Sequence, residues 1–134
     1  MEKNVLRMLD ANFNRSREGL RVCEDLCRFV LAAPREASRL RGMRHEITQV
    51  YKKFSQKGLL ASRDSANDPG RAFNRLEKNR SGWRDLYFAN LQRSKEALRV
   101  LEEGAKIIRP GEAPRLKGLR FKLYDHEKSV FGKF

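Results

Sequence analysis

Two aspartates lie four residues apart in a stretch that is rich in turn-forming residues. Asp64 and Asp68 belong to the segment RDSANDPG, in which Ser, Asn, Pro and Gly favour turns and Arg63 precedes the first carboxylate. Magnesium in proteins is commonly held by one or two carboxylates together with phosphate oxygens and water. The spacing therefore predicts a metal site at Asp64 and Asp68, although aspartate is also an ordinary residue of turns.

A second set of polar residues occurs twice in the chain. Residues 11–29 and 89–107 align without a gap, and nine of the nineteen positions are identical. Each copy places a glutamate three residues after an arginine, a spacing that favours an ion pair on one helix face. Guanidinium groups fixed in this way suit phosphate, because they are planar and permanently charged. The set comprises Asn12, Arg15 and Glu18 in the first copy and Asn90, Arg93 and Glu96 in the second.

This duplication predicts an anion-binding pocket between the two copies, lined by Asn12, Arg15, Asn90 and Arg93. The alternative is a polar network that only holds the helices in register. A shorter block, RLxGxR, also occurs twice and ends at Arg44 and at Arg120. We expect these two arginines to close the pocket from its other side.

The elements that carry these residues are predicted to be helices. Apolar residues recur with a helical period over about 9–31, and Pro34 fits the first turn of a second helix that ends near residue 54. Two more helices are expected over about 82–108 and 113–130, with Ser81 as the N-cap of the former. The apolar stripe of the first helix consists of Phe13, Leu20, Cys23, Cys27 and Leu31.

Short links after the first and third helices make each copy an antiparallel hairpin. The expected fold is therefore all-α: a four-helix bundle from two duplicated helical hairpins joined by a functional loop. Repeat unit one spans about 9–54, the loop about 55–81 and repeat unit two about 82–130, within a single domain of residues 1–134.

Composition and charge narrow the class of partner. The 134 residues are 40% hydrophobic, typical of a globular protein, and carry a formal net charge of +13. The excess lies in residues 34–57, at +5, and in residues 108–134, at +4. This distribution favours an anionic partner: a nucleotide, a phosphorylated metabolite, a nucleic acid or an acidic lipid. No stretch has the length or composition of a membrane span or signal peptide, which predicts a cytoplasmic protein without a membrane partner.

Several chemistries are disfavoured by what the sequence lacks. Neither GxxxxGK[ST] nor GxGxxG occurs, so the two common phosphate-binding loops are missing. His45 and His126 are the only histidines and neither is duplicated, which argues against a Ser-His-Asp or Cys-His hydrolase. Cys23 and Cys27 would stack on one helix face, a geometry that suits core packing better than a disulfide.

The runs LDANFNRSREGLRVCEDLCRF, RDSANDPG and ANLQRSKEALRVLEE together resemble one family over essentially the whole chain. It is the small all-helical hydroxymethylpyrimidine-phosphate kinase family, often fused to the N-terminal side of thiamine-phosphate synthase. The resemblance implies ATP-dependent phosphorylation of 4-amino-5-hydroxymethyl-2-methylpyrimidine phosphate to its diphosphate. It also implies Mg²⁺ as the metal and ATP as the co-substrate.

The resemblance supplies only the positions of the motifs, and we assign their residues roles in phosphoryl transfer as hypotheses. Asp64 and Asp68 would hold Mg²⁺, and Arg63 would stabilise the transferring phosphoryl group. Arg44 and Arg120 would neutralise phosphates. The sequence leaves open whether the site lies within one chain or at the interface of a homodimer, and which repeat binds ATP.

Two readings from other classes compete with the kinase. A noncatalytic basic helical module that binds nucleic acid would explain the charge, but the repeated Glu-containing helices carry almost no net charge. A noncatalytic domain that docks on thiamine-phosphate synthase would explain the fusion in relatives, but not the acidic loop.

Overall fold

The computed structural model describes residues 1–72 and 79–134, and within these ranges it contains helices and no strands. A π-helical turn at Leu26–Val30 extends the first helix, and single 3-10 turns lie at Pro69–Arg71 and Pro110–Glu112. The all-α class is therefore confirmed. The five α-helices are α1 (Glu2–Asp25), α2 (Pro34–Tyr51), α3 (Gln56–Ser62), α4 (Trp83–Ile108) and α5 (Ala113–Val130).

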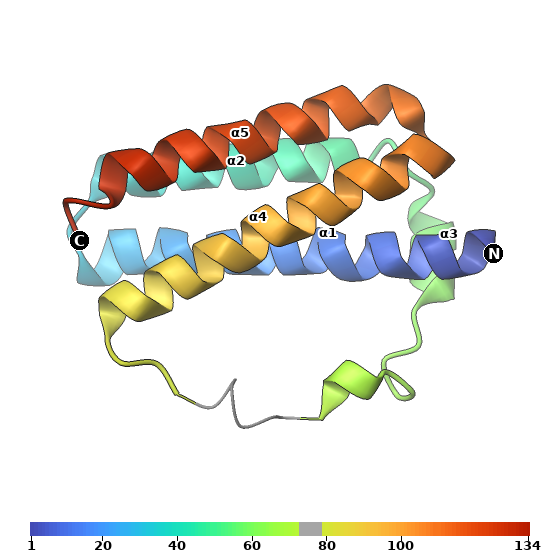
Figure 1. The fold of residues 1–134 in the computed structure, drawn as a ribbon, viewed down its shortest axis with the longest axis horizontal. Coiled ribbons are helices and arrows are strands. Elements are labelled where there is room, and N and C mark those ends of the chain that lie inside the picture. Colours follow the sequence, from blue (N-terminus) through green and yellow to red (C-terminus); the bar gives the residue numbers. More distant parts are fainter. Residues whose placement is uncertain (73–78) are drawn as a thin grey trace.

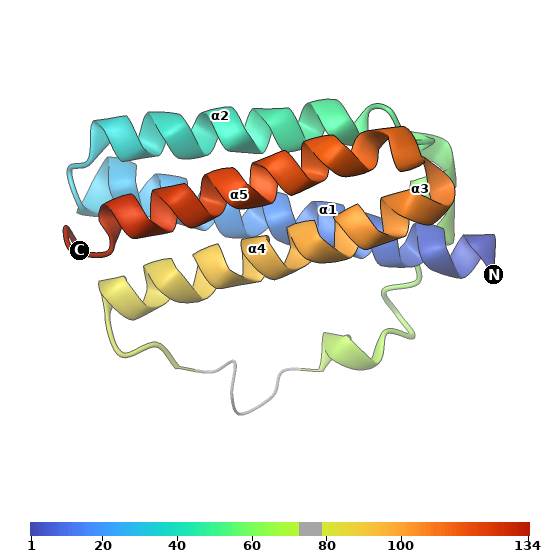
Figure 2. The ribbon, with the colours of Figure 1, turned by 45° about the horizontal axis from the view of Figure 1, so that its top comes forward.

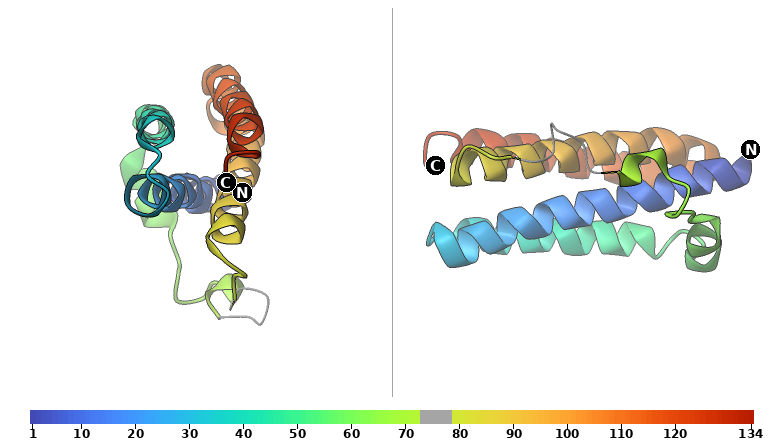
Figure 3. Two further views of the ribbon diagram at one scale, coloured as in Figure 1. Left: turned by 90° about the vertical axis from the view of Figure 1, so that its left-hand side faces the viewer. Right: turned by 90° about the horizontal axis from the view of Figure 1, so that it is seen from below.

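The four long helices form two antiparallel pairs. Helix α2 runs back along α1, and α5 runs back along α4 (Figure 1). Helices α1 and α4 cross and share the most extensive contact, whereas α2 and α5 touch each other only sparsely (Figures 2 and 3). The two expected hairpins are thus present and packed together. That they are duplicated copies stays a prediction.

Two helix boundaries differ from the expectation, and one short helix is additional. Helix α1 begins at Glu2, because its amphipathic pattern extends back through the first ten residues. The short helix α3 was not expected; the Ser55 hydroxyl caps it by accepting a hydrogen bond from the Gly58 backbone N–H at 3.0 Å. Ser81 is not the N-cap of α4: Gly82 takes that place, and the Asp85 carboxylate accepts a hydrogen bond from the Ser81 N–H at 3.0 Å.

The apolar stripe of α1 is buried as predicted. Phe13 is fully buried, and its ring packs edge-on against Tyr51 and Phe54 at 5.3 Å between centroids. Cys23 and Cys27 are free, buried thiols. Burial raises the pKa of Cys27 to about 11, so this thiol stays protonated at neutral pH.

Small residues allow α1 and α4 to approach closely at their crossing. A Cβ added to Gly19 would collide with the Ser94 hydroxyl and lie 2.8 Å from the backbone oxygen of Asn90. Across the same contact, the Ser94 hydroxyl donates a hydrogen bond to the Ser16 carbonyl at 3.0 Å. Ser16 and Ser94 are equivalent positions of the sequence repeat, so the repeated segments meet each other at this crossing.

Residues 63–72, which follow α3, and residues 79–82, which precede α4, lie on the side of α1 and α4 that is away from α2 and α5 (Figure 3, left). The loop expected over about 55–81 thus contains α3 and a 3-10 turn, and its residues 73–78 lie outside the described residues. Among the described helices, none is both long and apolar enough to cross a bilayer.

Candidate functional site

A groove of about 650 Å³ lies between α1 and α4, on the side of the 3-10 turn Pro69–Arg71. It brings together the four residues that the repeat predicts for substrate binding, two from each helix. Gly70 from the connection completes the rim. Its polar lining consists of Asn12, Arg15, Glu18, Asn90, Arg93 and Glu96.

The two asparagines are held in the same way. The side-chain amide of Asn12 donates to the Met8 carbonyl, and that of Asn90 to the Leu86 carbonyl, each at 2.9 Å. Both bonds reach back one turn along the asparagine's own helix. Each amide is therefore fixed in orientation at a matching position of the groove.

The two arginines are exposed in the groove, and their predicted partners do not hold them. Within the described residues, Arg15 forms no ion pair with Glu18, and Arg93 forms none with Glu96. The expectation of arginines fixed by glutamates was therefore wrong for this structure. Because these guanidinium groups are accessible to solvent, they are available to an anion. Glu96 accepts a bond from the Gln92 side chain through one oxygen, at 3.5 Å, which leaves its other carboxylate oxygen as an acceptor.

A smaller cavity of about 170 Å³ adjoins the N-terminal half of α1, and Asp64 and Asp68 both line it. Asp64 accepts hydrogen bonds from the Asn67 side chain at 3.0 and 3.1 Å, and these bonds, more than nearby cations, lower the pKa of its carboxyl. Asp68 accepts a bond from the Gly70 N–H at 2.8 Å. Both carboxylates thus shape their own turns and still face one cavity.

These residues fit a magnesium ion only in part. No group of three or more His, Cys, Asp or Glu side chains in the described ranges is arranged to hold a metal. Asp64 and Asp68 supply two hard oxygen donors, and water and substrate phosphates would have to supply the rest. Magnesium is commonly bound in this way, whereas a structural calcium or zinc site needs more protein ligands.

Arg63 binds a carboxylate that the sequence did not single out. Its Nε and Nη2 donate to the two oxygens of Asp10, at 2.8 and 2.9 Å. Asp10 is 4% exposed, and the paired carboxylate raises the pKa of Arg63. Arg63 is therefore engaged in fastening the loop to α1, which corrects the expectation that it is free to reach a transferring phosphoryl group. The sequence did distinguish Asp10 from the repeated residues. At the repeat offset of 78 its counterpart is Phe88, so this aspartate occurs in only one of the two copies.

The two cavities are neighbours along α1 and along the loop. Asp10 and Asn14 face the smaller cavity, whereas Asn12 and Arg15 face the groove. On the loop, Asp68 lines the smaller cavity, and Gly70, two residues later, lines the groove. The acidic loop and the groove with two arginines therefore adjoin each other, and together they make up the composite candidate site.

Arg44 and Arg120 do not belong to this site, contrary to expectation. Arg44 Nε donates to Glu24 at 2.9 Å, and Arg120 Nη2 reaches both oxygens of Glu102 at 3.3 Å. Neither arginine lines the groove or the acidic cavity. Each ties the two helices of one hairpin together, and the two ion pairs occupy equivalent positions of the sequence repeat.

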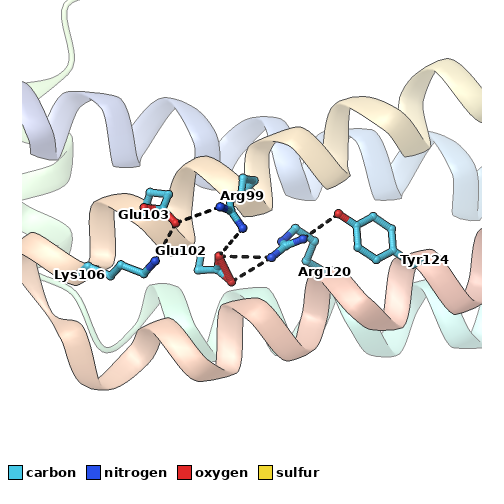
Figure 4. A network of polar contacts seen from close by, with 6 residues as sticks. All are labelled: Arg99, Glu102, Glu103, Lys106, Arg120 and Tyr124. Atoms are coloured by element: carbon cyan, nitrogen blue, oxygen red, sulfur yellow. Dashed lines mark hydrogen bonds and ion pairs between the residues drawn. The ribbon is translucent and has the colours of Figure 1, made fainter.

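The pair at Arg120 belongs to the network drawn in Figure 4. Arg120 also donates to the Tyr124 hydroxyl at 2.7 Å, and this bond, followed by Glu102, raises the pKa of the guanidinium. Arg99 reaches Glu102 at 3.2 Å and Glu103 at 3.5 Å. Arg120 therefore joins α5 to α4, whereas Arg99 pairs only with residues of its own helix.

Fold and site together define a basic, all-helical domain with a polar groove between two crossing helices and an acidic loop beside it. The sequence model of the ThiD2 family matches residues 7–129. The chain therefore belongs to the ThiD2 family.

Curated relatives extend well beyond the matched region. The chain is 40% identical over 129 residues to a thiamine-phosphate synthase of Synechocystis sp., covering 96% of this chain and 36% of the relative. The corresponding protein of Nostoc punctiforme is 37% identical over 133 residues, covering 98% and 37%. That of Rhodopirellula baltica is 33% identical over 123 residues, covering 91% and 33%. The chain thus spans about a third of the length of these relatives, and no solved structure matches it.

Proposed function

We propose that this chain transfers a phosphoryl group from ATP to 4-amino-5-hydroxymethyl-2-methylpyrimidine phosphate in thiamine biosynthesis, with Mg²⁺ as the metal. The family and the names of its relatives supply the pathway. The observation that carries the proposal is the composite site: two exposed arginines, Arg15 and Arg93, in one groove beside a loop with two aspartates.

The matching halves of the groove suit two ligands of related shape. ATP and the pyrimidine phosphate each combine an amino-substituted ring with a phosphate. In each half, an arginine is available to a phosphate, and a glutamate, Glu18 or Glu96, is available to accept from an amino group. The groove volume of about 650 Å³ lies within the usual range of ligand sites, roughly 300–1,000 Å³.

The reaction requires no protein base. The attacking atom is a phosphate oxygen, and because the second pKa of a phosphate monoester is about 6, it is largely deprotonated at pH 7. The obstacle is the mutual repulsion of two polyanions, which cationic side chains and fixed positions reduce. Asp64 and Asp68 would hold the magnesium ion, which supplies charge neutralisation on the transferred phosphates.

Replacement of one loop aspartate tests the proposal. Asp64→Asn should abolish ADP release in a coupled assay with the monophosphate and Mg-ATP, while the far-ultraviolet circular dichroism stays unchanged. Asp85→Asn is the matched control, because Asp85 lies outside both cavities and asparagine can still accept the bond from the Ser81 N–H. Wild-type turnover by Asp64→Asn would remove this aspartate from the mechanism.

A noncatalytic role in docking on thiamine-phosphate synthase is the second proposal, favoured by the occurrence of the matched region within longer proteins of that name. Tight binding to a separately purified synthase, with no ADP release under any condition, would favour docking over catalysis. Salt-dependent binding to RNA or DNA, also without ADP release, would instead favour a nucleic-acid module.

A further inference from the structure

Helices α1 and α4 run in opposite directions where they cross, and two contacts fix which of their residues lie at the same level (Figure 1). In the first, the serine contact, the Ser94 hydroxyl donates to the Ser16 carbonyl at 3.0 Å. In the second, the Cys23 thiol donates to the Tyr87 carbonyl at 3.3 Å. Seven residues forward along α1 therefore correspond to seven residues back along α4.

This register builds each half of the α1–α4 groove from both helices. Arg15 of α1 and Glu96 of α4 lie at the same level, to within one residue, on one side of the serine contact. Glu18 and Arg93 lie together on its other side. Within the described ranges, neither arginine forms an ion pair with the glutamate across from it. Each half thus presents one guanidinium and one carboxylate that do not neutralise each other.

An asparagine and a valine lie beyond the charged residues at each end of the groove. One end has Asn12 and Val100, and the other has Asn90 and Val22. Each asparagine donates its amide hydrogen to its own helix, and its Oδ1 accepts no bond from the part of the chain that the structure describes. An amide oxygen accepts from an amino group, and a valine packs against a ring. Each end therefore suits an amino-substituted heterocycle.

The spacing of these residues matches two substrates that meet through their phosphates. Because Arg93 is level with Glu18, three residues after Arg15, the two arginines are about 4.5 Å apart along the helix axes. Asn12 and Val22, at opposite ends, are ten residues apart on α1, or about 15 Å. Phosphates held by the two arginines thus converge in the middle of the groove, while the rings point away from each other. Phosphoryl transfer requires this convergence, since reacting atoms must come within about 3–3.5 Å.

The acidic loop lies beside only one of the two halves. The smaller cavity, which Asp64 and Asp68 line, is bounded on α1 by residues between Arg7 and Asn14, all of them before the serine contact. The half on this side, the loop half, consists of Asn12, Arg15, Glu96 and Val100. The other, the far half, consists of Glu18, Val22, Asn90 and Arg93. The loop half therefore has two carboxylates beside it that the far half lacks.

We propose that the loop half binds the nucleotide and that the far half binds the pyrimidine phosphate, an assignment that rests on the proposed kinase function. A polyphosphate needs a divalent cation more than a monophosphate does, and the carboxylates that suit such a cation adjoin the loop half. Arg15 pairs with the phosphates of the nucleotide, and Arg93 pairs with the phosphate of the acceptor.

The far half positions the acceptor for transfer. Its pyrimidine ring packs on Val22, which is 36% exposed, and its amino group donates to the Oδ1 of Asn90. In the transfer, an oxygen of the monophosphate forms a bond to the γ-phosphorus of ATP. The bond from that phosphorus to the bridging oxygen breaks, and ADP leaves the loop half with the electron pair.

Equilibrium binding of each ligand alone tests the assignment without turnover. Calorimetric titrations of the whole chain use ADP with Mg²⁺ in one series and the pyrimidine monophosphate in the other. Arg15→Gln should weaken the binding of Mg-ADP by about tenfold or more, for the loss of one charge-assisted contact, and should leave the monophosphate unaffected. Arg93→Gln should do the reverse. The ligand that each variant retains shows that its groove is still folded.

Two further variants separate the loop and the overall charge from the arginines. Asp68→Asn keeps an oxygen for the Gly70 N–H but removes the negative charge, so it should weaken the binding of Mg-ADP alone. Arg21→Gln removes a positive charge from α1 outside the groove, where Arg21 pairs with Asp25 at 3.3 Å, and should change neither affinity.

The outcomes distinguish this assignment from the kinase proposal. If the wild-type chain binds both ligands, but Arg15→Gln weakens the monophosphate selectively, weakens both equally or changes neither, the assignment is overturned and the kinase proposal stands. A wild-type chain that binds neither ligand overturns both, before any variant is made. Binding as assigned, without formation of the diphosphate, supports the assignment and overturns the kinase alone.

Discussion

The carboxylate of Asp10 accepts both the Nε and the Nη2 hydrogens of Arg63, at 2.8 and 2.9 Å, which joins α1 to the residue before Asp64. Arg7 adds a bond to the Asp64 carbonyl at 3.0 Å. The acidic segment is therefore attached to α1 at two consecutive residues. Because the counterpart of Asp10 on α4 is Phe88, this attachment is absent from the other half of the repeat. The groove has matching halves, but only one helix carries the acidic loop.

Loss of this attachment should release the loop. We expect Asp10→Ala to lower the free energy of unfolding by about 1–3 kcal/mol, because a hydrogen-bonded charge pair is lost. We expect a loss near the lower end of this range, since Arg63 is 44% exposed and water screens the charge pair. Urea unfolding measures the loss of stability. The rate of tryptic cleavage after Arg63 and Arg71 measures the release of the loop. Arg63→Lys keeps the charge but not the two-pronged contact and should give intermediate values. Unchanged cleavage in both variants would contradict the attachment.

The crossing of α1 and α4 should depend on Gly19. Gly19→Ala places a methyl group against Ser94 and the backbone at Asn90, so we expect a loss of about 1–3 kcal/mol in urea unfolding. Gly118→Ala is the control, because its methyl meets nothing within 4 Å in the middle of α5. This control should gain about 0.5–1 kcal/mol from helix propensity alone. A stabilised Gly19→Ala would show that the helices are not in close contact there.

Occupation of the two halves of the groove by different substrates should be visible in kinetics. Glu18→Gln should raise the KM for one substrate by about tenfold, for the loss of one charge-assisted hydrogen bond of roughly 1.4 kcal/mol, and Glu96→Gln should raise the KM for the other. Steady-state measurements with ATP and the monophosphate varied in turn assign the halves. Glu103→Gln, on an exposed part of α4 outside the groove, should change neither KM. Equal effects of both groove variants on both substrates would contradict separate half-sites.

The pH dependence of stability should report His126. Burial, then Arg39 and Lys133, lower its pKa from 6.5 to about 4, whereas Glu36 acts in the opposite direction. Between these pH values the unfolded chain binds a proton at His126 that the folded chain does not bind. The free energy of unfolding is therefore not reduced by this group above pH 6.5, and it falls as the pH drops toward 4. The loss from this group is at most about 3 kcal/mol.

His126→Gln should flatten this part of the profile in urea unfolding measured at several pH values. His45→Gln removes the other, exposed histidine and should keep the wild-type slope. The pKa of Glu36 is lowered, mainly by its bond to Lys133, so this carboxylate adds a loss of stability only below about pH 4.5. A His126→Gln slope equal to that of wild type would contradict a buried neutral imidazole.

The sequence was informative wherever a signal is local or repeated. Pro34 and the Pro110–Gly111 break delimit helices because proline and glycine act on the backbone near them. The groove residues Arg15 and Arg93 were predictable because the repeat marks both at once. The short helix α3 was missed, because seven residues that include Gly58 carry little periodic signal.

The contacts that were missed depend on tertiary structure. Asp10 and Arg63 lie 53 positions apart, and nothing local to either predicts the pairing. Arg44 and Arg120 were assigned to phosphate because they are duplicated, but duplicated glutamates, Glu24 and Glu102, also lie within each hairpin and hold them. Charge and repetition indicated important arginines without distinguishing a structural partner from a ligand.

Phosphorus NMR of the purified chain with Mg-ATP tests the central claim most directly. The chain is offered either the hydroxymethylpyrimidine monophosphate or the free hydroxymethylpyrimidine. Because the arginines of the groove would anchor the acceptor through its phosphate, the account predicts the diphosphate from the monophosphate and no phosphorylated product from the free alcohol. Product from both acceptors would contradict the phosphate anchor, and product from neither would contradict the kinase itself.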